Sequence, residues 1–184
     1  MDQKYKDMVD ENLETNSSEI FGNFSPEHAG YIIAQFIGRA QKSIEILSGN
    51  FSDAFYNGIS ITELLTSAAK RISQNGGTIR IITVNGKCCE KLRELEKDIN
   101  ASIPNVVKYV PAKCSNPAEV NHFMVVDGFR YRLEEPHPVP EGDMIPQCVK
   151  AEVCCNGFQK SANLLATFNA AWESLAGGVL KKNA

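Results

Sequence analysis

The sequence predicts an α/β domain in which helices cover both faces of a mixed, mostly parallel β-sheet. Segments with helical periodicity alternate with short apolar strands over residues 25–110, an order typical of parallel strands joined by helices. A hairpin follows at residues 120–134 and makes the sheet mixed. The length of 184 residues, with 43% hydrophobic and 22% charged residues, suits one domain with a full core.

Helix caps and β-branched runs predict the elements of the first half. Apolar residues recur at helical spacing in residues 1–22, which we expect to form a peripheral segment with a short amphipathic helix. Ser25 and Pro26 start the next helix as N-cap and first helical residue, and Ser60 with Glu63 forms a capping box for a later one. The expected elements are a helix ending near residue 42, a strand at 43–48, a helix ended by residues 75–77 and a strand at 78–84.

The second half is expected to contain a hairpin and a long closing helix. Asp127 and Gly128 are a turn signal between two alternating runs, and Phe168 and Trp172 lie four residues apart on the face of the closing helix that we expect to be buried. The expected elements are a helix at 88–100, strands at 106–110, 120–126, 129–134 and 148–155, a proline-rich loop at 135–147 and a helix at 159–175. One domain is therefore predicted at residues 23–176, with a tail at 177–184.

Composition limits the function and the location of the chain. There are 19 Lys and Arg against 22 Asp and Glu, and the net charge of -3 disfavours whole-surface binding of nucleic acid. The sequence has no apolar run long enough for a transmembrane helix and no secretory signal at its start, so we expect a cytoplasmic protein. The six cysteines form no C-x-x-C spacing, which predicts reduced thiols and neither a metal site nor a cofactor.

The residues that could carry chemistry gather on the hairpin and the loop after it. Alternation along the first strand places His122 on one face and Asn121 on the other. Pairing with the second strand would bring Arg132 or Glu134 close to His122. His122 is then either a hydrogen-bonded core histidine, which is the favoured interpretation, or a group at a cleft. The alternative interpretation of the hairpin charges is a solvated face with ordinary cross-strand charge pairs.

Several segments together resemble the phospholipase D superfamily. They are GGTIRII at residues 76–82, HFMVVDG at residues 122–128, and a closing helix that carries Phe168 and Trp172. The resemblance covers residues 26–175. It implies a phospholipase D-like α/β/α domain.

The catalytic signature of that family is H-x-K-x-x-x-x-D, followed downstream by G-S-x-N. The family's histidine attacks phosphorus, its lysine holds phosphate oxygens, and its aspartate orients a histidine. With Asp127 set on the aspartate, His122 falls on the lysine and Val120 on the histidine, and residues 134–137 read EEPH in place of G-S-x-N. Valine cannot act as a nucleophile, so the resemblance implies a degenerate motif of which only Asp127 matches.

Three functions remain open from the sequence. The favoured hypothesis is a non-catalytic module for binding or regulation, whose remnant cleft binds a phosphate-containing or other anionic ligand. The alternatives are a phosphodiesterase or nuclease with a rearranged site, and a scaffold subunit of a larger complex. Because the family builds one site from two motif copies, the resemblance also implies a homodimer. The candidate catalytic residues are His122, Asp127 and Glu134, and the candidate ligand-binding residues are Asn121, Arg132 and His137.

Overall fold

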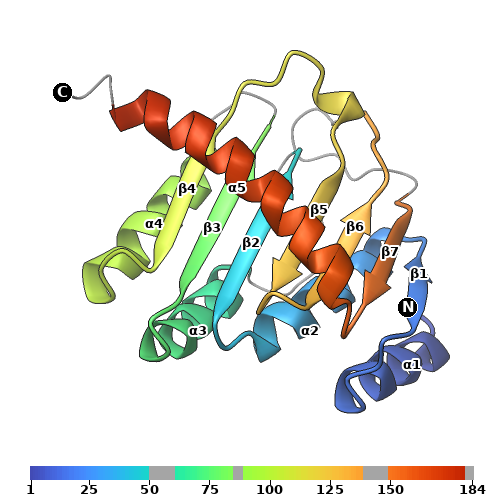
Figure 1. Cartoon of the computed structure of the whole chain (residues 1–184). Helices are drawn as coiled ribbons and strands as arrows, with labels where there is room; N and C mark the ends of the chain where they lie inside the picture. The colour runs from blue at the N-terminus through green and yellow to red at the C-terminus, as the bar shows by residue number, and fades with distance from the viewer. Residues whose placement is uncertain (50–60, 85–88, 139–148, 181–184) are drawn as a thin grey trace.

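The computed structural model describes residues 1–49, 61–84, 89–138 and 149–180. A seven-stranded sheet lies between two layers of helices, in the strand order β1-β7-β6-β5-β2-β3-β4 (Figure 1). The helices are α1 (Gln3–Glu14), α2 (Pro26–Arg39), α3 (Ile61–Gln74), α4 (Glu90–Ser102) and α5 (Phe158–Leu180), with a short 3-10 helix at Pro117–Glu119. The strands are β1 (Ile20–Asn23), β2 (Ser43–Ser48), β3 (Thr78–Thr83), β4 (Val107–Pro111), β5 (His122–Val126), β6 (Arg130–Glu134) and β7 (Ala151–Cys154).

The sheet is mixed, as predicted, but parallel pairing is limited to one half of it. Strand β3 pairs parallel with β2 and with β4, because α3 and α4 carry the chain back between these strands. The pairings β1–β7, β7–β6, β6–β5 and β5–β2 are all antiparallel. The sheet is therefore mixed but mostly antiparallel, which corrects the expectation that most of its strands are parallel. The reason is that the tight β5–β6 hairpin and the strands beside it run in alternating directions.

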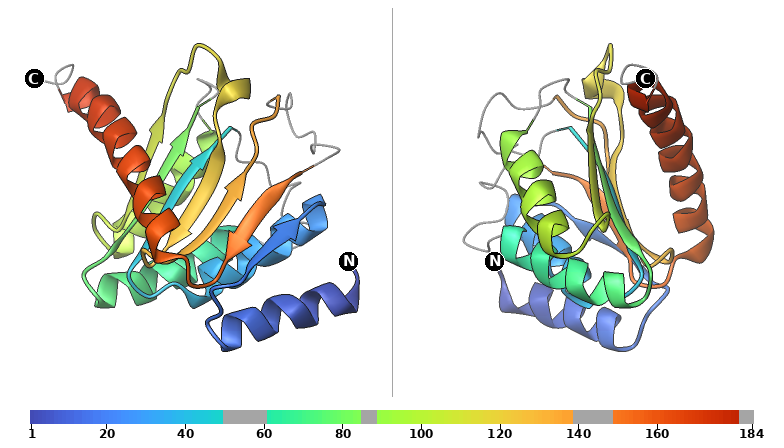
Figure 2. Two further views of the ribbon diagram at one scale, coloured as in Figure 1. Left: turned by 45° about the vertical axis from the view of Figure 1, so that its right-hand side comes forward. Right: turned by 90° about the vertical axis from the view of Figure 1, so that its left-hand side faces the viewer.

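Helices α1 to α4 cover one face of the sheet, and α5 alone crosses the other (Figure 2). Alternation along β5 divides its residues between these two layers, as predicted. Met124 packs in the core under α2 and α3, whereas Phe123 and Val125 pack under α5. His122 therefore lies on the face covered by α1 to α4.

Local sequence signals fix the ends of the helices. The Ser25 hydroxyl accepts the backbone N–H of His28 at 3.2 Å, and Pro26 occupies the first turn of α2, as the capping pattern predicts. Gly76 has a φ of 68° just after α3 and lets the chain turn into β3. The predicted capping serine of α3, Ser60, lies outside the described residues.

The N-terminal segment contains the expected amphipathic helix, α1, and a strand that the sequence did not predict. The Tyr31 hydroxyl of α2 donates to the carboxylate of Asp10 in α1 at 2.7 Å. Strand β1 then pairs antiparallel with β7 and forms one edge of the sheet. Within the described residues, we find no helix that combines the length and the apolar character needed to cross a bilayer.

The aromatic pair on α5 is only partly buried. Phe168 is fully buried, as predicted, but Trp172 is only half-buried. The two rings stack with centroids 5.7 Å apart, and the Arg80 guanidinium lies 5.0 Å from the Phe168 ring and 5.7 Å from the Trp172 ring. Arg80 also pairs with the buried Glu45 at 3.0 Å.

We therefore predict that the two aromatic residues differ in their contribution to stability. Phe168→Ala should lower the free energy of unfolding by about 3–5 kcal/mol, because it empties a fully buried site. Trp172→Ala should cost roughly half as much, because part of the ring already contacts water. Urea denaturation of both variants measures the difference, and a larger loss for Trp172→Ala would contradict this packing.

Candidate functional site

The β5–β6 hairpin places three buried polar side chains at one end of the sheet. His122 on β5 lies opposite Glu134 on β6, and Met124 lies opposite Arg132, so all of these residues share the face covered by α1 to α4. His122, Arg132 and Glu134 are exposed by only 6%, 4% and 4%. His137 follows β6 by three residues and turns back onto Glu134. These four residues are called the polar cluster below: His122, Arg132, Glu134 and His137.

Glu134 holds the polar cluster together through both carboxylate oxygens. Arg132 Nη1 donates to Oε2 at 2.6 Å, and His137 Nε2 lies 2.8 Å from Oε1. Arg132 Nε donates to Oδ1 of Asn23 at 2.7 Å. The rings of His137 and His122 meet edge to face, with centroids 4.7 Å apart. The guanidinium and the carboxylate are thus fixed in orientation by partners from β1, β6 and the segment after β6.

The surroundings shift the pKa of each titratable group in the polar cluster. Burial lowers the pKa of His122 to about 4, so this imidazole is neutral at pH 7. Burial by itself raises the pKa of Glu134, but the hydrogen bond from His137 and the neighbouring Arg132 lower it to about 2. The hydrogen bond to Glu134 raises the pKa of His137. The resulting cluster contains a carboxylate, a guanidinium and a neutral buried imidazole.

Two buried atoms of the polar cluster have no hydrogen-bond partner among the residues that the structure describes. They are Nε2 of His122 and Nη2 of Arg132. A buried polar atom without a partner is costly, and most such atoms in folded proteins are hydrogen-bonded. These two atoms are therefore the ones that a bound ligand would satisfy.

Asp127, a candidate catalytic residue, lies at the opposite end of β5. Five residues of extended strand separate it from the start of β5, a span of about 16 Å. Its carboxylate accepts the backbone N–H groups of Gln41 at 3.0 Å, Lys42 at 2.6 Å and Ser43 at 3.1 Å, and it pairs with Arg130 at 3.3 Å. The structure thus gives Asp127 a structural role in tying the hairpin turn to the start of β2. It does not place Asp127 where it could orient a histidine of the polar cluster.

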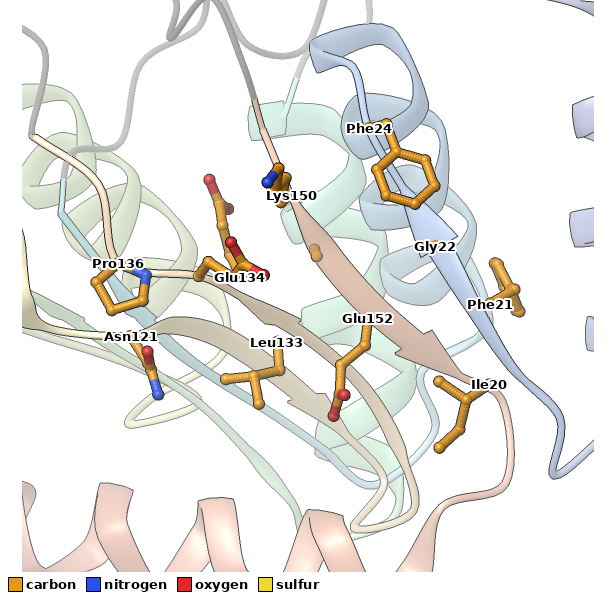
Figure 3. A pocket seen from close by; sticks show the side chains of 12 residues that line it. Ile20, Phe21, Gly22, Phe24, Asn121, Leu133, Glu134, Pro136, Lys150 and Glu152 are labelled. Carbon is orange, nitrogen blue, oxygen red and sulfur yellow. The ribbon is translucent and has the colours of Figure 1, made fainter.

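Asn121, a candidate ligand-binding residue, faces the other side of the sheet. It lines a pocket of about 430 Å³ along β6, β7 and β1. Figure 3 shows Asn121, Leu133 and Glu152 pointing to one side and Glu134 to the other. The pocket reaches the polar cluster only through Glu134, so Asn121 and His122 do not serve one site in this conformation.

Asn23 is the contact of the polar cluster that sequence reasoning missed. It lies at the end of β1, inside a stretch that has only four strand residues. One signal in the sequence could have indicated this strand, namely the alternation of residues 20–23 just before the cap of α2. In the structure, Phe21 and Asn23 are buried and Ile20 is exposed. A strand this short does not stand out from a peripheral segment by periodicity.

The strand order and the helices on both faces of the sheet give the chain a phospholipase D-like α/β fold. No protein-family model and no curated protein sequence matches the chain, so the similarity is one of structure. The phospholipase D family member Nuc from Salmonella typhimurium superposes with a TM-score of 0.60 at 15% identity, over 84% of this chain and 94% of that one. NucT from Helicobacter pylori gives 0.57 at 13% identity, over 85% and 98%.

A third similar structure is TrmBL2, an archaeal chromatin protein described by its mode of DNA binding. It superposes with a TM-score of 0.58 at 10% identity, over 94% of this chain and 60% of that one. The phospholipase D-like fold that the sequence resemblance implied is thus confirmed. These identities are too low to carry an activity from any of the three proteins to this chain.

We predict that Asp127 stabilises the fold without serving the polar cluster. Asp127→Ala removes a charged acceptor of three backbone N–H groups and should lower the free energy of unfolding by about 3 kcal/mol. Asp127→Asn should cost less, because asparagine keeps one acceptor oxygen and tolerates the φ of 56° at this position. Urea denaturation tests both variants, and an unchanged Asp127→Ala midpoint would contradict the structural role.

Proposed function

We propose that the chain is a non-catalytic phospholipase D-like module that binds a small phosphate-containing or other anionic ligand at the polar cluster. One observation carries this proposal. The imidazole of β5, His122, is buried with its Nε2 covered, while Val120 stands where the family's nucleophilic histidine is expected. An imidazole two residues from the nucleophile position does not attack the phosphorus of a diester substrate by the family's route.

The position of His122 also argues against the family's covalent route. It lies two residues beyond Val120 on the strand, a displacement of about 6.6 Å. The route further needs a cation to hold the non-bridging oxygens, and burial lowers the pKa of His122 to about 4, so its ring carries no charge at neutral pH. The two substitutions together remove the nucleophile and the cation.

Arg132 supports the binding of an anion. Asn23 and Glu134 hold the guanidinium in place, and its Nη2 remains without a partner in the described residues. A guanidinium with an unused donor matches a phosphate or carboxylate oxygen. The His137 side chain, at 18% exposed, is the most exposed of the cluster side chains, so the ligand group that enters must be small.

Proteins with similar folds are described in different ways. TrmBL2 is described as a chromatin protein that binds DNA, whereas Nuc is described as a phospholipase D family member. The net charge of -3 disfavours DNA as the ligand of this chain. A small anion held by fixed side chains needs no excess of surface charge.

The proposal includes a homodimer in the cytoplasm, with the cysteines reduced. Among the described residues, Cys114, Cys154 and Cys155 form no disulfide bond. A domain that carries one copy of the family's motif would meet a second copy across a two-fold axis. Sedimentation equilibrium of the purified chain tests this part, and a monomer at micromolar concentration would exclude it.

We predict that the purified protein binds inorganic phosphate and cleaves no phosphodiester. Calorimetric titration with phosphate, in buffer containing EDTA, should show binding that weakens at least about tenfold in His122→Ala, because the hydrogen bond between the unpartnered Nε2 and the charged ligand is lost. His28→Ala is the matched control, since it removes an imidazole that stacks on Tyr5 instead. Bis-p-nitrophenyl phosphate and a short single-stranded DNA should give no turnover.

Two results would overturn this proposal. Turnover that disappears in His122→Ala or His137→Ala, but not in His28→Ala, would establish the rearranged-site enzyme. The short His137–Glu134 contact at 2.8 Å is the feature that favours this second candidate, because a carboxylate can orient an imidazole base. Absence of both turnover and phosphate binding would leave the scaffold subunit.

A further inference from the structure

The polar cluster also contains the donor atoms of a metal site. His122, Glu134 and His137 each offer one ligand atom, and these three atoms lie within 4.8 Å of one another. Two imidazole nitrogens and one carboxylate oxygen are a donor set typical of Zn²⁺ and of other first-row divalent metal ions. We propose that His122, Glu134 and His137 bind a divalent transition metal ion, for which Zn²⁺ is the best match.

The remaining polar atoms of Glu134 and His137 are already held by other groups. Oε2 of Glu134 accepts from Arg132 at 2.6 Å, which leaves Oε1 for a metal ion. Nδ1 of His137 lies 2.9 Å from the carbonyl oxygen of Pro138, which only accepts, so Nδ1 carries a hydrogen. Such outer contacts orient the ligands of metal sites and set the tautomer of a ligating histidine.

The hydrogen on Nδ1 leaves Nε2 of His137 as the atom that faces Glu134 Oε1, at 2.8 Å. Without a metal ion, this nitrogen and the carboxylate oxygen share a hydrogen bond. With a metal ion bound, the same nitrogen gives its lone pair to the metal and its proton to solvent. One arrangement of side chains thus serves both states.

His122 supplies the third ligand from inside the fold. Its ring is buried, and its Nε2 has no hydrogen-bond partner in the described part of the chain. Tetrahedral zinc with bonds of 2.0–2.1 Å separates its ligand atoms by about 3.4 Å. The three donor atoms therefore need to move by roughly an ångström or less each to reach bonding distance.

The charge balance indicates what completes the coordination. Arg132 and Glu134 cancel, and a divalent ion adds two positive charges in a buried place. Three protein ligands leave a fourth position open, as in catalytic rather than structural zinc sites. An anion or hydroxide in that position, beside the unused Nη2 of Arg132, would lower the net charge. The metal site stands on its donor atoms and does not require the proposed phosphate binding.

The experiment uses the full chain, stripped with EDTA and dialysed. Titration with Zn²⁺ against a chromophoric chelator should give one equivalent bound per chain. His137→Ala should weaken Zn²⁺ binding by more than about 100-fold, since loss of an outer contact alone costs 10- to 100-fold in other sites. His28→Ala, the matched control, should bind as the parent does. Far-UV circular dichroism of each variant shows whether it is folded.

Replacing Zn²⁺ by Co²⁺ in the parent chain tests which ligand types bind the metal ion, and this measurement does not depend on the folding of any variant. Four-coordinate Co²⁺ held by His and Glu should give visible d–d absorption bands with no intense thiolate charge-transfer band in the near ultraviolet. A thiolate band, a stoichiometry below one, or unchanged affinity in folded His137→Ala would overturn the metal site. Phosphate binding in EDTA without Zn²⁺ binding would support the proposed function alone, and Zn²⁺ binding without phosphate binding would support the metal site alone.

Discussion

The antiparallel register of β5 and β6 is the constraint on which the site depends. It places His122 opposite Glu134 and puts Arg132 on the same face, so that their side chains meet beneath the helices. A slip of one residue would send these side chains to the face covered by α5. Asp127 secures this register from the far end, because its carboxylate holds three backbone N–H groups at the start of β2. Asp127 thus contributes to the site only through the stability of the hairpin.

The buried ion pair of Arg132 and Glu134 has an energetic consequence for the whole cluster. Both side chains are only 5% exposed, so their removal from water costs several kcal/mol per ion before any attraction is counted. The cost is offset only when the remaining donors and acceptors are also satisfied, which is the part that Asn23 and His137 play. Loss of any one partner leaves a buried charge without compensation. The polar cluster therefore adds little net stability, although removing any one of its members is costly.

Sequence reasoning reached the cluster but not its surroundings. Alternation along two strands was enough to bring His122, Arg132 and Glu134 to one face, and the shared face is what the structure has. The same alternation places Asn121 on the other face, where it lines a pocket together with Leu133 and Glu152. Asp127 is a candidate catalytic residue because of its place in a sequence motif, and a motif does not give the distance between side chains in the fold. The contact with Asn23 depends on the pairing of β1 with β7 at the edge of the sheet. This pairing joins segments far apart in the sequence, and the four residues of β1 alone do not predict it.

The same limit applies to strand direction and to burial. Periodicity identified the strands, but the antiparallel course of β7 and β1 follows from tertiary packing rather than from local pattern. Helical spacing places Phe168 and Trp172 on one face of α5, but it does not predict how wide the stripe of α5 that packs against the sheet is. Trp172 lies at the margin of that stripe, where Arg80 covers part of its ring.

With the family motif aligned on Asp127, as the sequence resemblance implies, His122 stands at the lysine position, and this changes what the position can do. A lysine ammonium there only donates hydrogen bonds and holds an anion by its charge. Burial lowers the pKa of His122 to about 4, which leaves a neutral ring with a lone pair on one nitrogen. The chemistry of the position thus shifts from charge to lone-pair donation, while Arg132 keeps a permanent cation beside it. A site with a neutral imidazole, an oriented carboxylate and a fixed guanidinium can hold a metal ion and an anion together, and it needs no nucleophile to do so.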